Sequence, residues 1–142
     1  MAMEEQRYLG LDFGGRRIGV AISDPGGIIA QPLDTLIVTG IRDAVEKVCG
    51  LIAERPVVGV VIGMPISLSG KPSQSSQEVE KFADRLRRRC PVPLYFEDER
   101  LSSRQAEATL HSLGGKIKGN KEKIDRISAA LILQSFLDRL VR

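Results

Sequence analysis

The sequence has little of the side chains that build thiol, imidazole and zinc sites. Its 142 residues include two cysteines, one histidine and no tryptophan, and only 4% of them are aromatic. Cys49 and Cys90 lie far apart without paired spacing, which argues against a zinc site or a disulfide framework and favours reduced thiols. We expect the single histidine, His111, to be an ordinary residue on a helix surface.

Long hydrophobic runs are also absent. No apolar run approaches the roughly 18 residues of a membrane span, and the acidic start, MAMEEQR, lacks the apolar core of a signal peptide. With the reduced thiols, these absences predict a soluble, cytoplasmic protein that does not bind membranes. The length and the ordinary apolar and charged fractions, 42% and 27%, predict one folded domain over residues 1–142.

Apolar runs and turn signals predict a mixed α/β sheet. Strands are expected over 8–13, 17–23, 28–38, 57–65 and 94–99, and helices over 41–54, 75–89, 102–112 and 121–140. Gly14-Gly15 between the first two runs is typical of a hairpin turn, and Pro32 makes the third strand an edge or irregular strand. This order predicts a five-stranded sheet, with a three-stranded antiparallel meander plus parallel strands and helices on both faces.

A carboxylate interrupts the first apolar run. Asp12 stands in YLGLDFGGRR near the end of the first strand, where burying a bare charge costs several kcal/mol. It must therefore be paired, hydrogen-bonded or bound to a metal ion, and the glycines that follow leave room for a bulky ligand. The alternative is a turn-capping role in which the carboxylate accepts backbone N–H bonds. The local sequence favours neither.

Further carboxylates end the fifth expected strand, in FEDERLS. Strand alternation places Asp98 on one face, and Glu97 and Glu99 on the other. This cluster is either a solvated strand end, which is the commoner case, or part of a ligand crevice. Arg100 beside it could screen the charge or reach a phosphate.

A third acidic position, Asp125, lies near the start of the last helix. It is either a partner of the helix dipole or a site residue, because small Ser128 and Ala129 would let this helix approach the sheet closely. If the acidic positions converge at one rim of the sheet, they form an oxygen-only cage that suits Mg²⁺ or Mn²⁺. Such ions can activate water and stabilise the leaving oxygen of a phosphodiester.

Four segments together resemble one family. LDFGGRRIGVAISD, VVGVVIGMPISLSG, FEDERLSSRQAEATL and NKEKIDRISAALILQSFLD occur in that order and cover about residues 7–138. They are similar to the YqgF family, RuvC-like nucleases of the RNase H-like fold to which Holliday junction resolution and pre-16S rRNA processing are attributed. The resemblance implies a metal-dependent endonuclease for structured nucleic acid, acting in 5′-end maturation of pre-16S rRNA or in Holliday junction resolution.

The resemblance also implies roles for the acids. Asp12, Glu99 and Asp125 correspond to the catalytic, metal-holding carboxylates, and Asp98 is a further candidate ligand that alternation alone does not separate from Glu99. Two departures from the pattern concern the substrate. ISLSG stands where family members often carry an acidic or amide residue, and VVGVVIGMP ends without the carboxylate of RuvC. The second departure makes nuclease activity in general better supported than junction resolution.

The net charge is only +3, so the placement of basic residues matters more than their number. Eight lie in or beside the segments with the three acids, and we predict that they bind nucleic-acid phosphates: Arg16, Arg17, Arg100, Arg104, Lys116, Lys118, Lys121 and Lys123. The arginines of 85–89 spread around a helix and are predicted to form a solvated surface. Few aromatics make base stacking minor, so recognition would use shape and backbone.

Two other function classes fit part of the pattern. A phosphotransferase of the actin, Hsp70 and sugar-kinase superfamily shares the Asp-x-Gly-Gly turn, but it needs two such lobes and 142 residues supply one. A catalytically silent nucleic-acid or ribosome-assembly module would keep the fold, and the joint presence of the three acids argues against it. The residues that would contact the backbone suit RNA and DNA equally, and both monomer and homodimer stay open.

Overall fold

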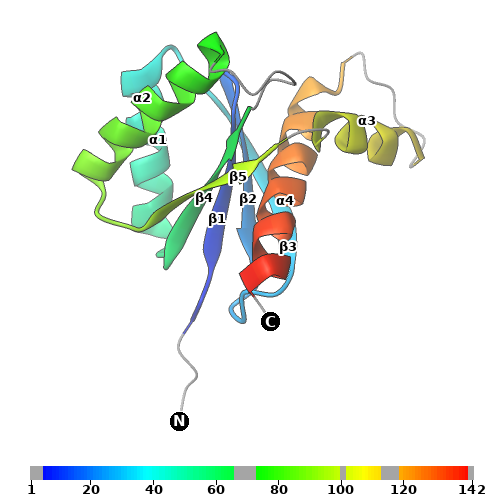
Figure 1. Ribbon diagram of the computed structural model, residues 1–142, viewed down its shortest axis with the longest axis horizontal. Helices are drawn as coiled ribbons and strands as arrows, with labels where there is room; N and C mark the ends of the chain where they lie inside the picture. The colour runs from blue at the N-terminus through cyan, green and yellow to red at the C-terminus, as the bar shows by residue number, and fades with distance from the viewer. Residues whose placement is uncertain (1–4, 66–72, 100–101, 113–118, 141–142) are drawn as a thin grey trace.

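The computed structural model describes residues 5–65, 73–99, 102–112 and 119–140 (Figure 1). Five strands form one sheet in the order β3-β2-β1-β4-β5. The first three strands are an antiparallel meander, and β4 and β5 continue parallel to β1. The predicted mixed sheet is therefore confirmed.

The elements alternate as the sequence predicts. The strands are β1 Tyr8–Phe13, β2 Arg17–Ser23, β3 Ala30–Ile37, β4 Gly59–Met64 and β5 Leu94–Asp98. The helices are α1 Ile41–Glu54, α2 Gln74–Arg89, α3 Ser102–Ser112 and α4 Lys121–Leu140. Three of the helices have the predicted bounds, and α2 begins one residue earlier because Ser73 caps its first turn. Within the described ranges, no helix is long and apolar enough to cross a membrane.

The edge strand β3 begins at Ala30, two residues later than predicted. The carboxylate of Asp24 accepts the N–H groups of Ile28 and Ile29 at 2.7 and 2.8 Å, which holds these residues in a turn. Pro32 lies in this edge strand beside a shift of register against β2. The prediction of an edge or irregular strand is confirmed in both respects.

Helices α1 and α2 cover one face of the sheet with a conventional aliphatic core (Figure 1). Four apolar side chains of α2 are buried against the sheet, namely Val79, Phe82, Ala83 and Leu86. They meet large residues of the central strands, such as Leu11 and Ile62, that are also fully buried. Burial of these side chains supplies most of the hydrophobic stabilisation on this face.

Helix α4 packs against the opposite face of the sheet, and its backbone lies close to the backbone of the strands (Figure 1). A Cβ built on Gly19 of β2 would lie 1.9 Å from the carbonyl oxygen of Asp125, and one on Gly10 of β1 would lie 2.7 Å from Cβ of Leu133. Only glycine fits at these two positions, because any side chain would meet the helix. The prediction that α4 approaches the sheet closely is confirmed, and α3 packs on α4 through Ala106 and Ile124.

Candidate active site at the carboxyl edge of the sheet

Strand β1 carries Asp12 to the edge where β1, β4 and β5 end together. Alternation along β1 puts Leu11 into the aliphatic core and leaves Gly10 and Asp12 on the side of α4. The cross-strand partner of Asp12 is Gly19, which has no side chain between Asp12 and the helix. The hairpin turn that follows contains Gly15 with a φ of 74°, a conformation that favours glycine.

Glu99 follows β5 directly and lies beside Asp12. Its N–H donates to the carbonyl of Met64 at 3.2 Å, so the chain still follows the end of β4 there. A Cβ built on Gly63 would lie 2.7 Å from Oε2 of Glu99, so this glycine of β4 leaves the space that the carboxyl group occupies. Glu99 donates a hydrogen bond to the carboxylate of Asp12.

The environment of this pair favours one retained proton. Burial, followed by the charge and the hydrogen bond of Asp12 and the charge of Asp98, raises the pKa of Glu99 to about 8. Burial also raises the pKa of Asp12; the hydrogen bond from Glu99 opposes this rise. Two carboxyl groups at such close range cannot both ionise cheaply, so the pair holds one proton near neutral pH.

Asp125 faces the same corner from α4. Nε of Arg17 donates to Oδ2 of Asp125 at 2.6 Å, and the Asp125 side chain is only 18% exposed. The same residue touches β2 through its carbonyl group at Gly19, so both its backbone and its side chain are fixed. Its charge reaches Asp12 and raises the pKa of that carboxyl group. The structure thus brings Asp12 and Glu99 into contact and places Asp125 beside them, bound to Arg17.

Strand alternation placed Asp98 and Glu99 on different faces but left open which of them meets the site. In the structure, Glu99 lies beside Asp12 and Asp98 does not. Asp98 is exposed on the opposite face of β5, although its charge still acts on Glu99. Glu97 shares the face of Glu99 and is 6% exposed. It accepts a hydrogen bond from Ser135 at 2.7 Å and forms an ion pair with Arg139. This pairing ties β5 to α4. The sequence indicated this pairing only through the spacing of Ser135 and Arg139, which are four positions apart and so share one face of the helix.

The predicted phosphate-binding residues divide into three groups. Arg16 is exposed at the hairpin turn, Arg17 binds Asp125, and Lys121 and Lys123 are exposed in the first turn of α4. Three lie outside the described residues: Arg100, Lys116 and Lys118. Arg104 belongs to α3, and its side chain is not described. The serines of ISLSG also fall outside the described ranges.

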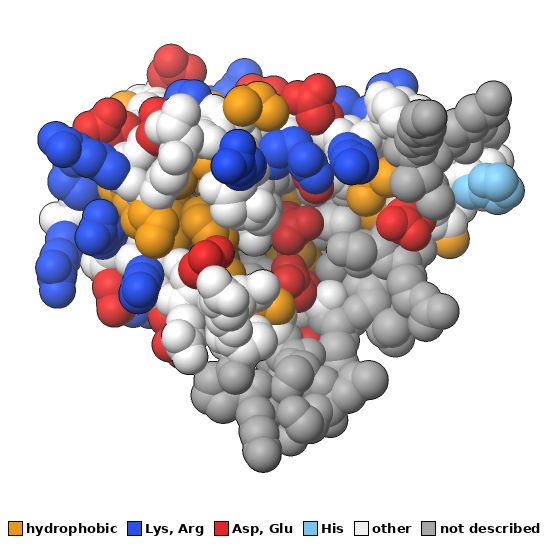
Figure 2. Space-filling model, turned by 90° about the horizontal axis from the view of Figure 1, so that it is seen from above, with side chains coloured by type: hydrophobic (Ala, Val, Ile, Leu, Met, Phe, Trp, Pro, Cys, Tyr) orange, Lys and Arg blue, Asp and Glu red, His pale blue; other side chains and the backbone are white. Residues whose placement is uncertain are grey.

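A hollow of about 800 Å³ opens beside the hairpin turn. Arg16, Arg17, Thr39 and Glu78 are among the residues that line it, so it connects the turn after β1 with the starts of α1 and α2. Figure 2 shows this end of the molecule, with acidic side chains near the middle of the face and basic side chains beside them. The arrangement suits a polyanion held next to a carboxylate centre.

The carboxylates fit a divalent cation in part. Among the described residues, no three His, Cys, Asp or Glu side chains are placed to hold a metal ion by themselves. Mg²⁺, however, commonly binds one or two carboxylates together with water and substrate phosphate. Asp12 and Glu99 offer such a pair, and burial raises the pKa of both carboxyl groups, so a bound cation would favour their ionised forms. The hydroxyl of Ser128, three residues after Asp125, is buried with no hydrogen-bond partner in the described part of the chain.

Comparison with known proteins identifies the family. Residues 6–139 match the model of RuvX, described as Holliday junction resolvase and also called YqgF. The chain belongs to the RuvX family. A Chloroflexus aggregans protein named "Putative pre-16S rRNA nuclease" is 44% identical over 138 residues, 96% of each chain. A Koribacter versatilis protein with the same name is 41% identical over 133 residues, 94% of this chain and 87% of that one.

Solved structures show the same fold at low identity. Thermus thermophilus RuvC in complex with a Holliday junction substrate superposes with a TM-score of 0.60 and 15% identity, covering 96% of each chain. Fowlpox virus resolvase in complex with Holliday junction DNA gives 0.58 and 11%, covering 96% of this chain and all of that one. The RuvX chain therefore has the RNase H-like fold of RuvC, as the sequence resemblance implied.

Proposed function

We propose that this RuvX protein is a divalent-metal-dependent endonuclease that hydrolyses phosphodiester bonds in structured nucleic acid. One observation carries the proposal: Asp12 and Glu99, far apart in the sequence, are hydrogen-bonded to each other at the carboxyl edge of the sheet. Asp125 lies beside them on α4. Buried carboxyls that repel one another are costly for the fold, so their joint presence supports a chemical role.

In this proposal Asp12 and Glu99 hold Mg²⁺ or Mn²⁺, and Asp125 is the third catalytic carboxylate. A bound divalent cation supplies a Lewis acid for activating water and for stabilising the leaving oxygen. Asp98 is exposed on the other face of β5, so it is not included among the ligands. Arg17 positions Asp125 through the 2.6 Å hydrogen bond and, with 39% of its side chain exposed, also meets the substrate backbone.

The basic residues around this centre hold the nucleic-acid backbone. Arg16, Lys121 and Lys123 are exposed at the hairpin and at the start of α4, where they would contact phosphates on either side of the carboxylates. Arg100, Arg104, Lys116 and Lys118 stay candidates for the same role from their sequence positions. Phosphate contacts of this kind position a substrate without selecting its sequence.

The names of the relatives favour an RNA substrate. Two proteins at least 41% identical over nearly the whole chain are named for pre-16S rRNA, so we propose 5′-end maturation of pre-16S rRNA as the reaction. Holliday junction resolution is the second candidate, because the family model is described by that activity. We place the reaction in the cytoplasm, where the free thiols of both cysteines are the usual state. Residues 1–142 would act as one nuclease domain, as monomer or homodimer.

A cleavage assay tests the proposal. Labelled precursor RNA and a four-way DNA junction are incubated with protein and Mg²⁺ or Mn²⁺, and products are resolved by gel electrophoresis. We expect Asp12→Asn and Glu99→Gln to lower the rate by at least about a thousandfold, since each removes a carboxyl ligand from the proposed metal site. Asp98→Asn is the matched control, because it changes the same chemical group on the opposite face of β5.

The control decides between the proposal and its alternative. If Asp98→Asn cleaves like wild type while the other two variants are inactive and folded, the carboxylate centre is catalytic. If wild type binds nucleic acid but neither substrate is cut with any divalent ion, the protein is a binding module for nucleic acid or ribosome assembly.

A further inference from the structure

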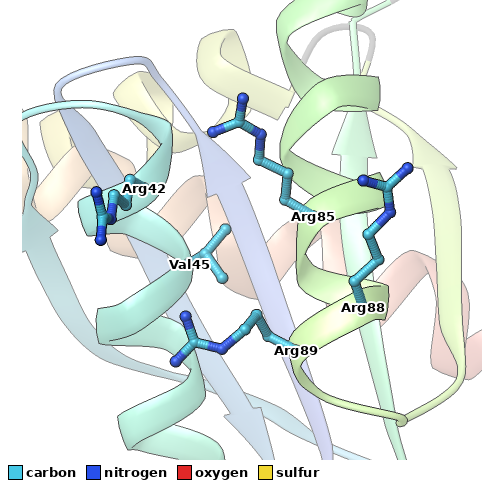
Figure 3. Close-up of a pocket in the computed structure, with 5 residues that line it drawn as sticks. All are labelled: Arg42, Val45, Arg85, Arg88 and Arg89. Atoms are coloured by element: carbon cyan, nitrogen blue, oxygen red, sulfur yellow. The ribbon is translucent and has the colours of Figure 1, made fainter.

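A second hollow lies between α1 and α2, away from the carboxylates. Its volume is about 290 Å³, and it is lined by Arg42 and Val45 of α1 and by Arg85, Arg88 and Arg89 of α2. Figure 3 shows the guanidinium groups of Arg85 and Arg89 reaching from α2 toward α1. We call these five residues the arginine pocket. Four of its five lining residues are therefore permanently cationic.

The four pocket arginines form no ion pair among the described residues. Two acids of the same helices are engaged elsewhere: Asp43 pairs with Lys47, and Asp84 pairs with Arg87. Four like charges around one hollow repel each other, so an external polyanion would stabilise this surface.

The pocket is built for an anion with several oxygens. Its arginines are exposed, whereas Val45 is 3% exposed and closes the floor between the helices. Arg85 and Arg89 lie one turn apart on α2 and point toward α1, whereas Arg88 lies on the side of α2 farther from α1 (Figure 3). Guanidinium forks match the oxygens of a phosphate, and several of them can contact successive phosphates of a chain.

The arginine pocket continues the basic surface of the active site. Ile41 lines the hollow that contains Arg16 and Arg17, and the next residue, Arg42, lines the arginine pocket. Figure 2 shows basic side chains gathered on the α1–α2 side of the molecule. A backbone that leaves the carboxylates past the hairpin turn can therefore continue over the start of α1.

We propose that the arginine pocket binds phosphodiesters of the nucleic-acid substrate at a distance from the cleaved bond. The inference rests on the proposed nuclease function for its ligand, and it extends the binding surface to α1 and α2. The pocket contributes affinity and orientation without taking part in the reaction. It gives the substrate a second point of attachment that base sequence does not affect.

Equilibrium binding measures this contribution directly. Fluorescence anisotropy follows a labelled RNA hairpin and a labelled four-way DNA junction, in EDTA to prevent cleavage, between about 50 and 200 mM KCl. Arg42→Ala/Arg85→Ala removes one pocket arginine from each helix. Arg55→Ala/Arg87→Ala removes one arginine from the end of α1 and one from α2 outside the pocket. Both double variants lose the same charge, and all four side chains are exposed.

We expect the pocket variant to bind at least about tenfold more weakly and to lower the salt slope by about 1.4–1.8, the value for two lost phosphate contacts. The control variant should change the slope by less than half as much. Arg85→Glu gives a second test, with weaker binding than Arg85→Ala. Unfolding curves that match wild type show that these exposed changes leave the fold intact.

The outcomes separate this inference from the proposed function. If wild type binds and the two double variants share its affinity and slope, the pocket inference is wrong while the carboxylate centre is untouched. An equal loss of affinity in both double variants also overturns the pocket inference, because the loss would then come from the lower overall charge and not from the pocket. A further outcome is that wild type binds tripolyphosphate while the pocket variant keeps the wild-type affinity for nucleic acid. The pocket would then be a site for small polyphosphates, which contradicts the proposal. Absence of nucleic-acid binding by wild type would overturn this inference, whereas the cleavage assay with Mg²⁺ or Mn²⁺ tests the proposed function separately.

Discussion

The two faces of the sheet differ in how they pack. On the α1–α2 side, large aliphatic side chains such as Leu11, Ile62 and Leu86 fill the space between helix and strand. On the α4 side, Gly10 and Gly19 bring the helix down to the strand backbone. Carboxyl groups lie where the α4 face ends. The aliphatic face supplies stability, and the glycine face supplies the short distances that bring carboxylates of three separate segments to one corner.

A large core truncation should affect stability alone. Leu86 is fully buried on the α1–α2 face, so Leu86→Ala should lower the free energy of unfolding by about 2–5 kcal/mol. Urea denaturation followed by circular dichroism measures this loss. At a temperature where the variant stays folded, cleavage per folded molecule should equal that of wild type. A variant that is folded but inactive would show that the aliphatic face also positions the site.

A single methyl group on the glycine face should affect stability and activity together. Gly19→Ala would place Cβ 1.9 Å from the carbonyl oxygen of Asp125, so α4 must shift and carry Asp125 with it. We expect a loss of about 3 kcal/mol by denaturation, the upper part of the usual range for overpacking. Cleavage by the folded fraction should also fall at least about tenfold, because catalytic groups tolerate little displacement.

Gly50→Ala is the matched control for this change. Gly50 lies in α1 with nothing within 4 Å of a built Cβ, and it should gain up to about 1 kcal/mol through helix propensity. Equal destabilisation of the two alanine variants would contradict the contrast between the faces.

The raised pKa of Glu99 predicts how stability depends on pH. In the unfolded chain this carboxyl ionises near its ordinary value of 4.5, whereas in the folded protein its pKa is about 8. The folded state then binds more protons than the unfolded state between these values, so the free energy of unfolding falls as pH rises from about 4.5 to about 8. Glu99→Gln cannot ionise and should be the more stable protein at pH 8, by at least about 1 kcal/mol.

Denaturant titrations at several pH values check this slope. Asp98→Asn should keep most of the wild-type slope, because Asp98 is the smallest of the influences on Glu99. A Glu99→Gln profile that is parallel to wild type would show that Glu99 ionises normally in the folded protein.

Local sequence signals were sufficient for the order of the elements but not for every bound of the strands. Spacing of apolar residues predicted the bounds of α1, α3 and α4, and glycine in the turn predicted the hairpin. The late start of β3 was missed, because it depends on a side chain, Asp24, that bonds backbone N–H groups four and five residues ahead. Such a turn competes with strand pairing and leaves no trace in hydrophobic periodicity.

The sequence selected three acidic residues that the structure places at one corner, but it did not reveal the contacts between them and their neighbours. Asp12, Glu99 and Asp125 were selected from motif positions, and strand alternation placed Glu97 and Glu99 on one face without saying which face meets α4. The bond between Arg17 and Asp125 spans 108 positions, so only the register of the fold reveals it. Likewise Cys49 and Cys90, distant in sequence, are free thiols near enough that Cys90 adds to the rise that burial causes in the pKa of Cys49.

The central claim is that the glycine face assembles a divalent-metal centre from Asp12 and Glu99. Measuring cation binding tests this claim most directly. Isothermal titration of Mn²⁺ into wild type, Asp12→Asn, Glu99→Gln and Asp98→Asn needs no substrate. We expect wild type and Asp98→Asn to bind with similar affinity, and the other two variants to bind at least about tenfold more weakly. Equal affinity in all four proteins would contradict this account of the site.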